Sequence, residues 1–163
     1  MSAQVIVVDD EAAIREAVQQ WLELSGFTVR TCASAAEALA LVDRDFPGIV
    51  VSDVRMPGSD GLQLLDRLLQ VDTDLPVILV TGHGDVATAV QAMHNGAFDF
   101  IEKPYAPDLF IDITRRAMSH RALVLENRTL KIELARHSKN ASDFIGRNPA
   151  MEKLRTLIGN VAS

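Results

Sequence analysis

The sequence contains one cysteine, Cys32, so it cannot form a disulfide bond within the chain. We expect Cys32 to be a small buried side chain rather than a reactive thiol. No apolar run reaches the roughly 18 residues that a membrane span requires, and the N-terminus lacks a basic stretch followed by an apolar one. These absences argue against a disulfide-stabilised or membrane protein and predict a cytoplasmic location.

Aromatic residues are scarce at 5%, but hydrophobic residues make up 48% of the chain and charged residues 23%, as in ordinary globular proteins. The net charge is −6, although residues 115–139 carry seven Lys or Arg and two Glu side chains. The rest of the chain is therefore acidic, which argues against nucleic-acid binding by its main body. We interpret the basic segment as a solvated helix face.

Short apolar runs alternate with segments of helical periodicity along most of the chain. A helix cap is expected at Ser34, with Glu37 completing a capping box. The predicted strands are residues 5–8, 27–32, 49–52, 77–80 and 98–101. The predicted helices are residues 12–24, 34–46, 62–69, 86–94 and a long one from residue 107 to about residue 137. This alternation predicts an α/β fold, a doubly wound five-stranded parallel sheet with a C-terminal helical linker.

Polar side chains follow four of the predicted strands: Asp9 and Asp10, then Asp53, Thr81 and Lys103. Each has a simpler explanation when it is taken alone, because Asp is common in helix caps and Thr or Lys beside Gly or Pro is common in loops. The carboxyl ends of parallel strands, however, lie at one edge of the sheet, where functional sites of doubly wound folds are found. Their joint occurrence in this order therefore favours a functional site.

Three carboxylates in one pocket repel one another, by about 3 kcal/mol for two charges about 5 Å apart at an effective dielectric of about 20. Such a cluster needs a cation, and oxygen ligands of this kind favour Mg²⁺. The cation can also neutralise a phosphoryl group, to which Lys103 offers a charge and Thr81 a hydroxyl. Asp53, on a central strand, is then the natural nucleophile for forming an acyl phosphate.

Residues 5–11, 52–58, 81–82 and 103–104 resemble the receiver domain of two-component response regulators, which has a flavodoxin-like fold, over about residues 4–120. In that family a histidine kinase phosphorylates one aspartate, and the domain is a regulator rather than an enzyme. The resemblance implies the following roles: Asp9 and Asp10 as the acidic pair that binds Mg²⁺, Asp53 as the phosphorylated residue, Arg55 as a backbone carbonyl ligand of the metal, Thr81 and Phe100 as the switch residues, and Lys103 as the phosphate contact before a cis peptide bond to Pro104.

The sequences DVRMP at residues 53–57 and TGHGD at residues 81–85 resemble, more specifically, the nitrogen-regulatory class, whose members activate sigma-54-dependent transcription. Regulators of C4-dicarboxylate transport are the most similar subgroup. His83 lies between two glycines without a second ligand at suitable spacing, so we expect an exposed loop residue rather than a metal ligand. The resemblance implies a homodimer that pairs through the face of the fourth and fifth helices and through the linker, in response to phosphorylation.

The long C-terminal helix carries an imperfect heptad pattern. Asn127 at a core position fits a two-stranded coil whose register it would fix. The alternative is one amphipathic helix that packs on its own domain or on a missing neighbour, and we favour the dimeric coil. The predicted contact positions are Ile113, His120, Asn127 and Leu134 at a, and Arg116, Leu123, Leu130 and His137 at d.

The predicted domains are a receiver at residues 1–120, a coiled-coil linker at residues 121–142 and a fragment at residues 143–163. The fragment resembles the opening of the sigma-54 interaction AAA+ domain, yet no GxxxxGK[ST] motif follows it. We therefore interpret the chain as part of a longer regulator. Binding of ATP, sigma-54 RNA polymerase and DNA would belong to the absent part.

Two other classes of protein share some of these residue types. A haloacid-dehalogenase-like phosphatase also uses an aspartate nucleophile and Mg²⁺, but its motif is Asp-x-Asp after the first strand, whereas Asp53-Val54-Arg55 lacks the second acid and follows the third. A flavodoxin-like cofactor carrier would need a phosphate loop rich in Ser, Thr and Gly. The acidic pair at residues 9–10 would repel a cofactor phosphate, so both classes are disfavoured.

Overall fold

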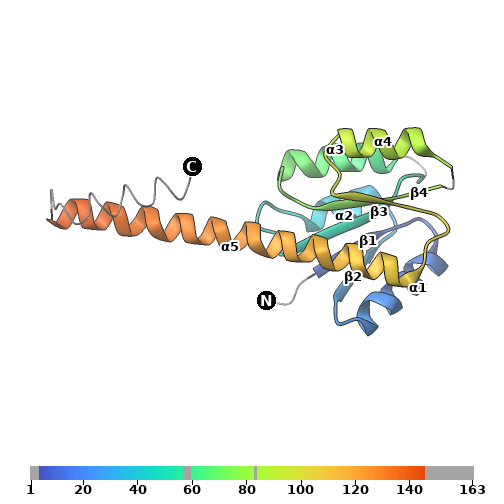
Figure 1. The fold of residues 1–163 in the computed structure, drawn as a ribbon, viewed down its shortest axis with the longest axis horizontal. Coiled ribbons are helices and arrows are strands. Elements are labelled where there is room, and N and C mark those ends of the chain that lie inside the picture. Colours follow the sequence, from blue (N-terminus) through green and yellow to red (C-terminus); the bar gives the residue numbers. More distant parts are fainter. Residues whose placement is uncertain (1–3, 57–59, 83, 146–163) are drawn as a thin grey trace. The chain divides into compact units, whose positions relative to one another are not determined.

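The computed structural model describes residues 4–56, 60–82 and 84–145, with side chains described as far as residue 137. Strands and helices alternate through these residues (Figure 1). The strands are β1 Gln4–Val8, β2 Thr28–Cys32, β3 Gly48–Asp53, β4 Val77–Thr81 and β5 Asp99–Glu102. The helices are α1 Ala12–Leu24, α2 Ala35–Leu41, α3 Gly61–Val71, α4 Val86–His94 and α5 Pro107–Ile145, so α5 continues past its predicted end near residue 137.

The strands form one parallel sheet in the order β2-β1-β3-β4-β5. The predicted doubly wound five-stranded parallel sheet is therefore confirmed. The chain runs from β1 outward to β2 and then returns past β1 to β3. The connections that follow β1 and β3 therefore run in opposite directions across the sheet, away from the boundary between these two strands. A crevice forms at the carboxyl ends of strands at such a boundary, and it is the usual position of a site in this fold.

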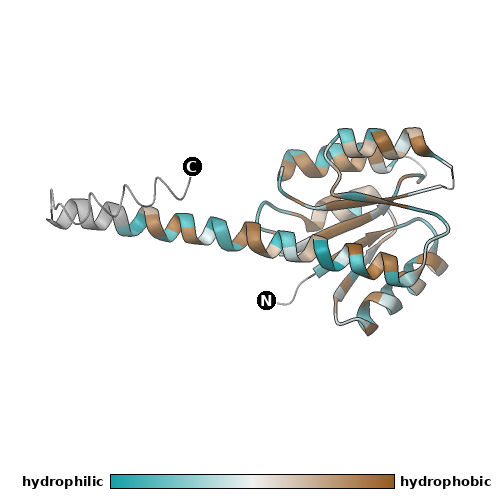
Figure 2. Cartoon of the chain, viewed as in Figure 1, coloured by the Kyte–Doolittle hydropathy of each residue, from teal (hydrophilic) through white to brown (hydrophobic). Residues whose placement is uncertain are grey.

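The sheet separates two hydrophobic cores. One lies between the sheet and α1 and α5, and the other lies between the sheet and α2, α3 and α4. Strands β1, β3 and β4 are buried on both faces, which explains their continuous apolar sequences (Figure 2). Cys32 lies in the second of these cores and is buried, as predicted, and burial raises the pKa of its thiol.

The N-terminus of α2 has the predicted cap, because Ser34 Oγ accepts a hydrogen bond from the backbone N–H of Glu37 at 3.3 Å. The reciprocal bond runs from the backbone N–H of Ala33, rather than that of Ser34, to Glu37 Oε2 at 2.8 Å. The helix ends at Leu41, earlier than predicted, because Val42 adopts an extended backbone. The turn that follows leads into β3.

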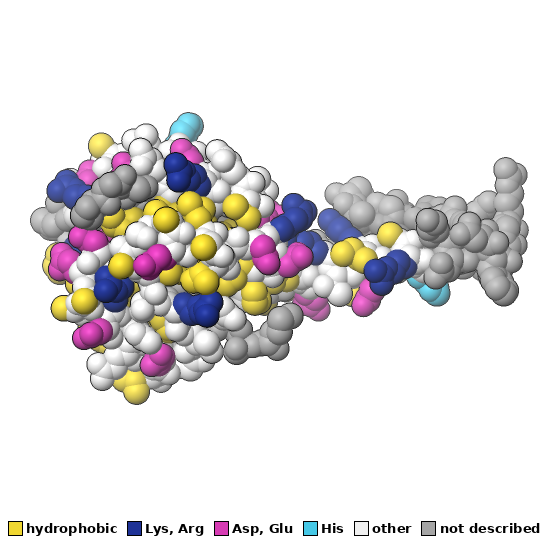
Figure 3. Space-filling model, turned by 180° about the vertical axis from the view of Figure 1, so that it is seen from behind, with side chains coloured by type: hydrophobic (Ala, Val, Ile, Leu, Met, Phe, Trp, Pro, Cys, Tyr) yellow, Lys and Arg dark blue, Asp and Glu magenta, His cyan; other side chains and the backbone are white. Residues whose placement is uncertain are grey.

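Charged side chains are mixed over the surface of the receiver part. On the face in Figure 3, acidic and basic residues are interspersed, and the described side chains there form no large area of one sign. In the basic segment of α5, Arg115, Arg116, Lys131 and Arg136 are exposed, as expected for a solvated face. The interpretation is wrong for Arg121, which is 1% exposed and belongs to the interior of the domain.

The chain divides into two compact units, Met1–Val124 and Leu125–Ser163, and α5 contributes residues to both. The predicted boundaries at residues 120 and 142 stay predictions. Most of the AAA+-like segment, residues 146–163, lies outside the described residues. None of the helices described is both long and apolar enough for a membrane crossing.

Candidate functional site

The predicted site residues lie at the carboxyl edge of the sheet. Asp9 directly follows β1, Asp53 and Thr81 are the last residues of β3 and β4, and Lys103 follows β5. Backbone hydrogen bonds extend the ladder past the strand ends, since the N–H of Lys103 donates to the carbonyl of Thr81 at 2.9 Å. These bonds hold the side chains of neighbouring strands in a fixed arrangement.

Asp53 and Lys103 form the central contact of the site. Lys103 Nζ lies 2.7 Å from Asp53 Oδ2, although the two residues are 50 positions apart in the chain. The other oxygen, Asp53 Oδ1, accepts the backbone N–H of Arg55 at 3.0 Å. Burial alone would lower the pKa of Lys103, but the hydrogen bond and charge of Asp53, with a contribution from Asp9, outweigh it and raise that pKa. The ammonium is therefore kept charged beside the carboxylate.

Asp9 is the second carboxylate of the site, and it is 5% exposed. Its Oδ1 accepts the backbone N–H of Glu11 at 2.9 Å. Burial raises the pKa of Asp9, this hydrogen bond opposes the shift, and the negative charge of Asp53 adds to it. The carboxylate thus carries negative charge that its surroundings only partly compensate.

Asp10, unlike Asp9, is exposed. Within the part of the chain that the structure describes, no three Asp, Glu, His or Cys side chains are grouped closely enough to hold a metal ion. The charge of Asp10 nevertheless contributes to the raised pKa of Asp9, so the two carboxylates are close to each other. The structure brings Asp9 and Asp53 together beside Lys103, and the role of Asp10 as a metal ligand stays a prediction.

This donor set fits Mg²⁺, which keeps several waters and often binds only one or two protein carboxylates. Asp9 and Asp53 offer oxygen ligands, and the incomplete compensation of charge at Asp9 favours a cation. Asp10 and the backbone carbonyl of Arg55 are the further donors that the sequence predicted.

Thr81 Oγ1 is buried and lacks a hydrogen-bond partner among the described residues. An unpaired buried hydroxyl is unfavourable by about 1–3 kcal/mol, so a hydrogen-bond partner supplied by a bound group would stabilise the site. Phe100 on β5 lies opposite Leu79, two residues before Thr81, so both side chains project from the same face of the sheet. Phe100 is half-buried. The two predicted switch residues are thus neighbours beside the site.

Two features beside the site were not predicted from the sequence. Arg55 Nη2 lies 3.9 Å from Asp85 Oδ2 across an open cleft of about 520 Å³. A second, apolar groove of about 620 Å³ lies between α1 and the segment that contains Lys103 and Tyr105. At this groove the rings of Trp21 and Tyr105 meet edge to face, with centroids 6.2 Å apart. In the sequence, Trp21 was recognisable only as an apolar position of a predicted helix, and no pattern singled out Tyr105.

The peptide bond between Lys103 and Pro104 is cis, as predicted. His83 and residues 57–59, on which part of the resemblance depends, lie outside the described residues.

Residues 5–115 match the response regulator receiver domain family. The chain is 51% identical over 158 residues to the C4-dicarboxylate transport transcriptional regulatory protein DctD of Rhizobium meliloti (strain 1021), covering 97% of this chain and 34% of that protein. It is 36% identical over 158 residues to the DNA-binding transcriptional regulator NtrC of Escherichia coli (strain K12), covering 97% and 33%. The chain thus spans about a third of the length of these curated relatives.

Among solved structures, the beryllofluoride-activated NtrC4 receiver domain dimer has a TM-score of 0.67 and 36% identity, covering 72% of this chain and 98% of that one. The relatives confirm the predicted similarity to nitrogen-regulatory and C4-dicarboxylate-transport regulators. The family match, the sheet order and the acidic edge agree with one another, and the chain belongs to the response regulator receiver domain family.

Proposed function

We propose that Asp53 accepts a phosphoryl group from a partner histidine kinase. The observation that carries this proposal is the 2.7 Å contact between Asp53 and Lys103 at the carboxyl edge of the sheet, beside the buried Asp9. An oxygen of Asp53 attacks phosphorus, an O–P bond forms, and the P–N bond of the kinase phosphohistidine breaks as that histidine leaves. The product is an aspartyl phosphate.

Lys103 would follow the negative charge as it moves from the carboxylate to the phosphoryl oxygens. Its ammonium is already held at 2.7 Å from Asp53, so the cation is in position before transfer. Mg²⁺, when bound, supplies neutralisation of the phosphoryl charge. Asp9, Asp53 and the backbone carbonyl of Arg55, with Asp10, would hold that ion.

Thr81 and Phe100 would then report the phosphorylated state. The unpaired hydroxyl of Thr81 gains a hydrogen-bond partner when it donates to a phosphoryl oxygen, which favours its movement toward Asp53. Phe100, on the same face of the sheet, follows into the space that Thr81 leaves. A phenylalanine ring lacks a hydroxyl, so it responds through packing alone. The surface formed by α4 and α5 changes as a result.

This change would alter how two copies pair through the α4–α5 face and the linker. Leu123, Leu130 and Leu134, three of the predicted coil positions, are exposed apolar residues of α5. Ile113, the first predicted position, packs in the core and is 4% exposed, so it is not available to a partner chain. The paired region would therefore begin after this residue. His120 is exposed, and its ring lies 5.7 Å from that of Phe98.

The longer protein would be a cytoplasmic sigma-54-dependent transcription activator. The names of the relatives, a transcriptional regulatory protein and a DNA-binding transcriptional regulator, support this assignment. Binding of ATP, sigma-54 RNA polymerase and DNA would reside in parts that this chain does not include. The chain itself would act as a regulator rather than as an enzyme.

Phosphoryl labelling tests the acceptor directly. The wild-type chain, incubated with Mg²⁺ and acetyl phosphate, is expected to gain one acid-stable, base-labile phosphoryl group, measured by intact-protein mass. The Asp53→Asn variant should gain none. Asp66→Asn, which changes an exposed carboxylate on α3, should label like the wild type. Undiminished labelling of the Asp53→Asn chain would show that another residue is the acceptor.

A further inference from the structure

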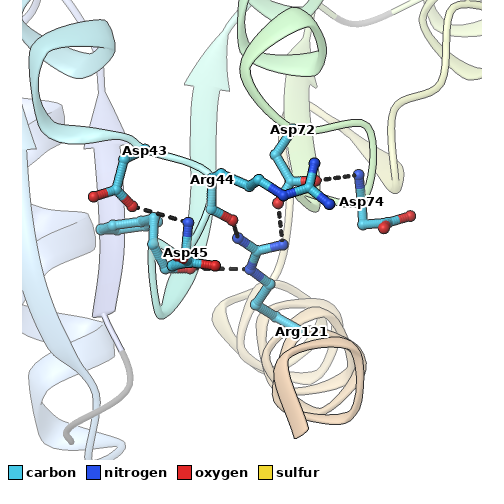
Figure 4. A network of polar contacts seen from close by, with 7 residues as sticks. Asp43, Arg44, Asp45, Asp72, Asp74 and Arg121 are labelled. Carbon is cyan, nitrogen blue, oxygen red and sulfur yellow. Dashed lines mark hydrogen bonds and ion pairs between the residues drawn. The ribbon is translucent and has the colours of Figure 1, made fainter. Parts of the chain in front are cut away.

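Helix α5 contains a fully buried arginine on the side of the domain away from Asp53. Arg121 Nη1 lies 2.7 Å from Asp72 Oδ2, and the two side chains are 1% and 0% exposed. Its remaining nitrogens donate to backbone carbonyls, Nε to Phe46 and Nη2 to Arg44, each at 3.0 Å (Figure 4). We call these four residues the Arg121 cluster.

Stability alone does not account for the Arg121 cluster. Removing two charges from water is unfavourable, and apolar residues of similar volume often stabilise a core equally well. A guanidinium differs from apolar groups in directing its donors along fixed lines in one plane. Because its three acceptors come from two separate connections of the fold, the cluster fixes the rotation and axial position of α5 within the unit Met1–Val124.

The elements that meet Arg121 also reach the acceptor site at their other ends. Arg44 and Phe46 lead into β3, whose last residue is Asp53. Asp72 ends α3, and its backbone N–H donates to Leu68 at 3.0 Å.

Helix α3 begins at Gly61, whose N–H donates to the carbonyl of Val54 at 2.7 Å. A Cβ on Gly61 would lie 2.6 Å from the backbone oxygen of Asp53, so the start of α3 packs directly against the acceptor backbone. Both β3 and α3 thus run from the acceptor to the Arg121 cluster.

We propose that the Arg121 cluster couples phosphorylation at Asp53 to the linker part of α5. Arg121 is a positioning residue: it transmits a displacement of β3 and α3 to the helix, four positions before the second unit begins at Leu125. This role rests on the proposed function, because it requires that Asp53 be the acceptor. It differs from the α4–α5 surface route in that the signal leaves through the opposite ends of the strands.

The test uses the 163-residue chain with Mg²⁺ and beryllium fluoride as the phosphoryl mimic. Sedimentation equilibrium gives the dimer dissociation constant with and without the mimic, and ¹⁹F NMR gives its binding. The wild type is expected to change its dissociation constant by about tenfold. The double variant Asp72→Leu/Arg121→Met, which replaces the pair by apolar residues, should fold and bind the mimic but change by less than about twofold. A purely structural role of the pair would affect folding or binding of the mimic. Loss of the change in the dimer dissociation constant, with binding of the mimic intact, therefore supports a coupling role.

The matched control is Arg115→Met, the same substitution at an exposed arginine of α5 that lies over the Phe27 ring. It should retain the wild-type change. Should the double variant fail to fold, Arg121→Lys decides, because lysine keeps the charge beside Asp72 but cannot engage both carbonyls in fixed directions. Its change should fall by at least about threefold.

A tenfold change in the folded double variant, or in Arg121→Lys, overturns the proposal. So does a wild type that binds the mimic without any change in its dissociation constant. A chain that neither binds the mimic nor labels at Asp53 refutes the acceptor assignment itself, and the mass measurement identifies that case.

Discussion

At the scale of single residues, the charge of Asp9 opposes folding. Its raised pKa means that the folded chain holds a proton more readily than the unfolded chain does, so ionisation lowers stability. That loss is fully present above the folded-state pKa of Asp9, shrinks as the pH falls through that pKa, and is gone once the pH is below the unfolded-state pKa. The ionised carboxylate that the site needs at this edge of the sheet therefore lowers the stability of the folded chain.

Replacing Asp9 by Asn should therefore stabilise the chain at pH 7 without divalent cations, by about 0.5–2 kcal/mol. The amide oxygen can still accept the N–H of Glu11. Urea unfolding measures the effect, and added Mg²⁺ should stabilise the wild type more than the variant, because it binds the folded wild type. A variant less stable than the wild type without Mg²⁺ contradicts the electrostatic argument.

Thr81 provides a second residue-scale prediction. Thr81→Val removes the unpaired buried hydroxyl and should raise the free energy of unfolding by about 1 kcal/mol. The same variant should lose the response of the dimer to beryllium fluoride. Thr81→Ser is the control, since it keeps the hydroxyl: it should lose about 0.8 kcal/mol for the missing methyl group but keep the response. An unchanged response in Thr81→Val would remove Thr81 from the switch.

The sequence was sufficient to place Asp53 beside Lys103, because parallel strands bring their ends to one edge. It could not show that Asp10 is exposed, since neighbouring acids in a loop look alike in a sequence. Nor could it identify Arg121 and Asp72 as partners. They are 49 residues apart, and each lies in a segment whose other charged residues face solvent.

At the scale of secondary-structure elements, the Arg121 cluster should contribute more to holding α5 than an exposed ion pair of the same helix does. Arg121→Met removes the buried ion pair with Asp72 and should lower the free energy of unfolding by about 3–5 kcal/mol. Arg116→Met breaks an exposed pair with Asp112 at 3.3 Å and should lower it by less than about 1 kcal/mol. Urea unfolding of both variants gives the comparison. Similar losses in the two variants would show that burial does not determine the value of the pair.

Element limits followed the sequence where local signals were strong. Helices α1 and α4 have the predicted limits, and Ser34 caps α2 as expected. The end of α2 was wrong because no glycine or proline marks it. The turn after Leu41 instead presents carbonyls to Arg121, a tertiary requirement that no local pattern records.

At the scale of the whole molecule, pairing of two chains should depend on the exposed leucines of α5. Each buried leucine contributes about 1.5–3 kcal/mol, so Leu130→Ser or Leu134→Ser should weaken the dimer by about tenfold or more. Ile132→Ser is the matched control, because Ile132 is also exposed but lies outside the heptad positions. Sedimentation equilibrium measures all three. An equal effect of Ile132→Ser would contradict the predicted register.

The architecture was predictable because every central strand is apolar on both faces, which only a sheet covered by two helical layers can satisfy. The sequence was less able to predict which apolar residues of α5 belong to the core. Ile113 fits a heptad as well as it fits the core, and only packing against the sheet decides between them. In α5 the spacing of core residues and the heptad spacing of a coiled coil therefore overlap, and the sequence alone does not separate them.

The edge-to-face contact of Trp21 with Tyr105 has a practical consequence. The sequence contains one tryptophan, and its indole touches the ring two residues after Lys103, the cation that holds Asp53. Indole emission depends on the polarity and charge of its surroundings, so an event at Asp53 that displaces Lys103 should alter the fluorescence of the unlabelled chain. The protein thus carries its own optical probe, suited to following acceptor occupancy in real time by stopped-flow spectroscopy.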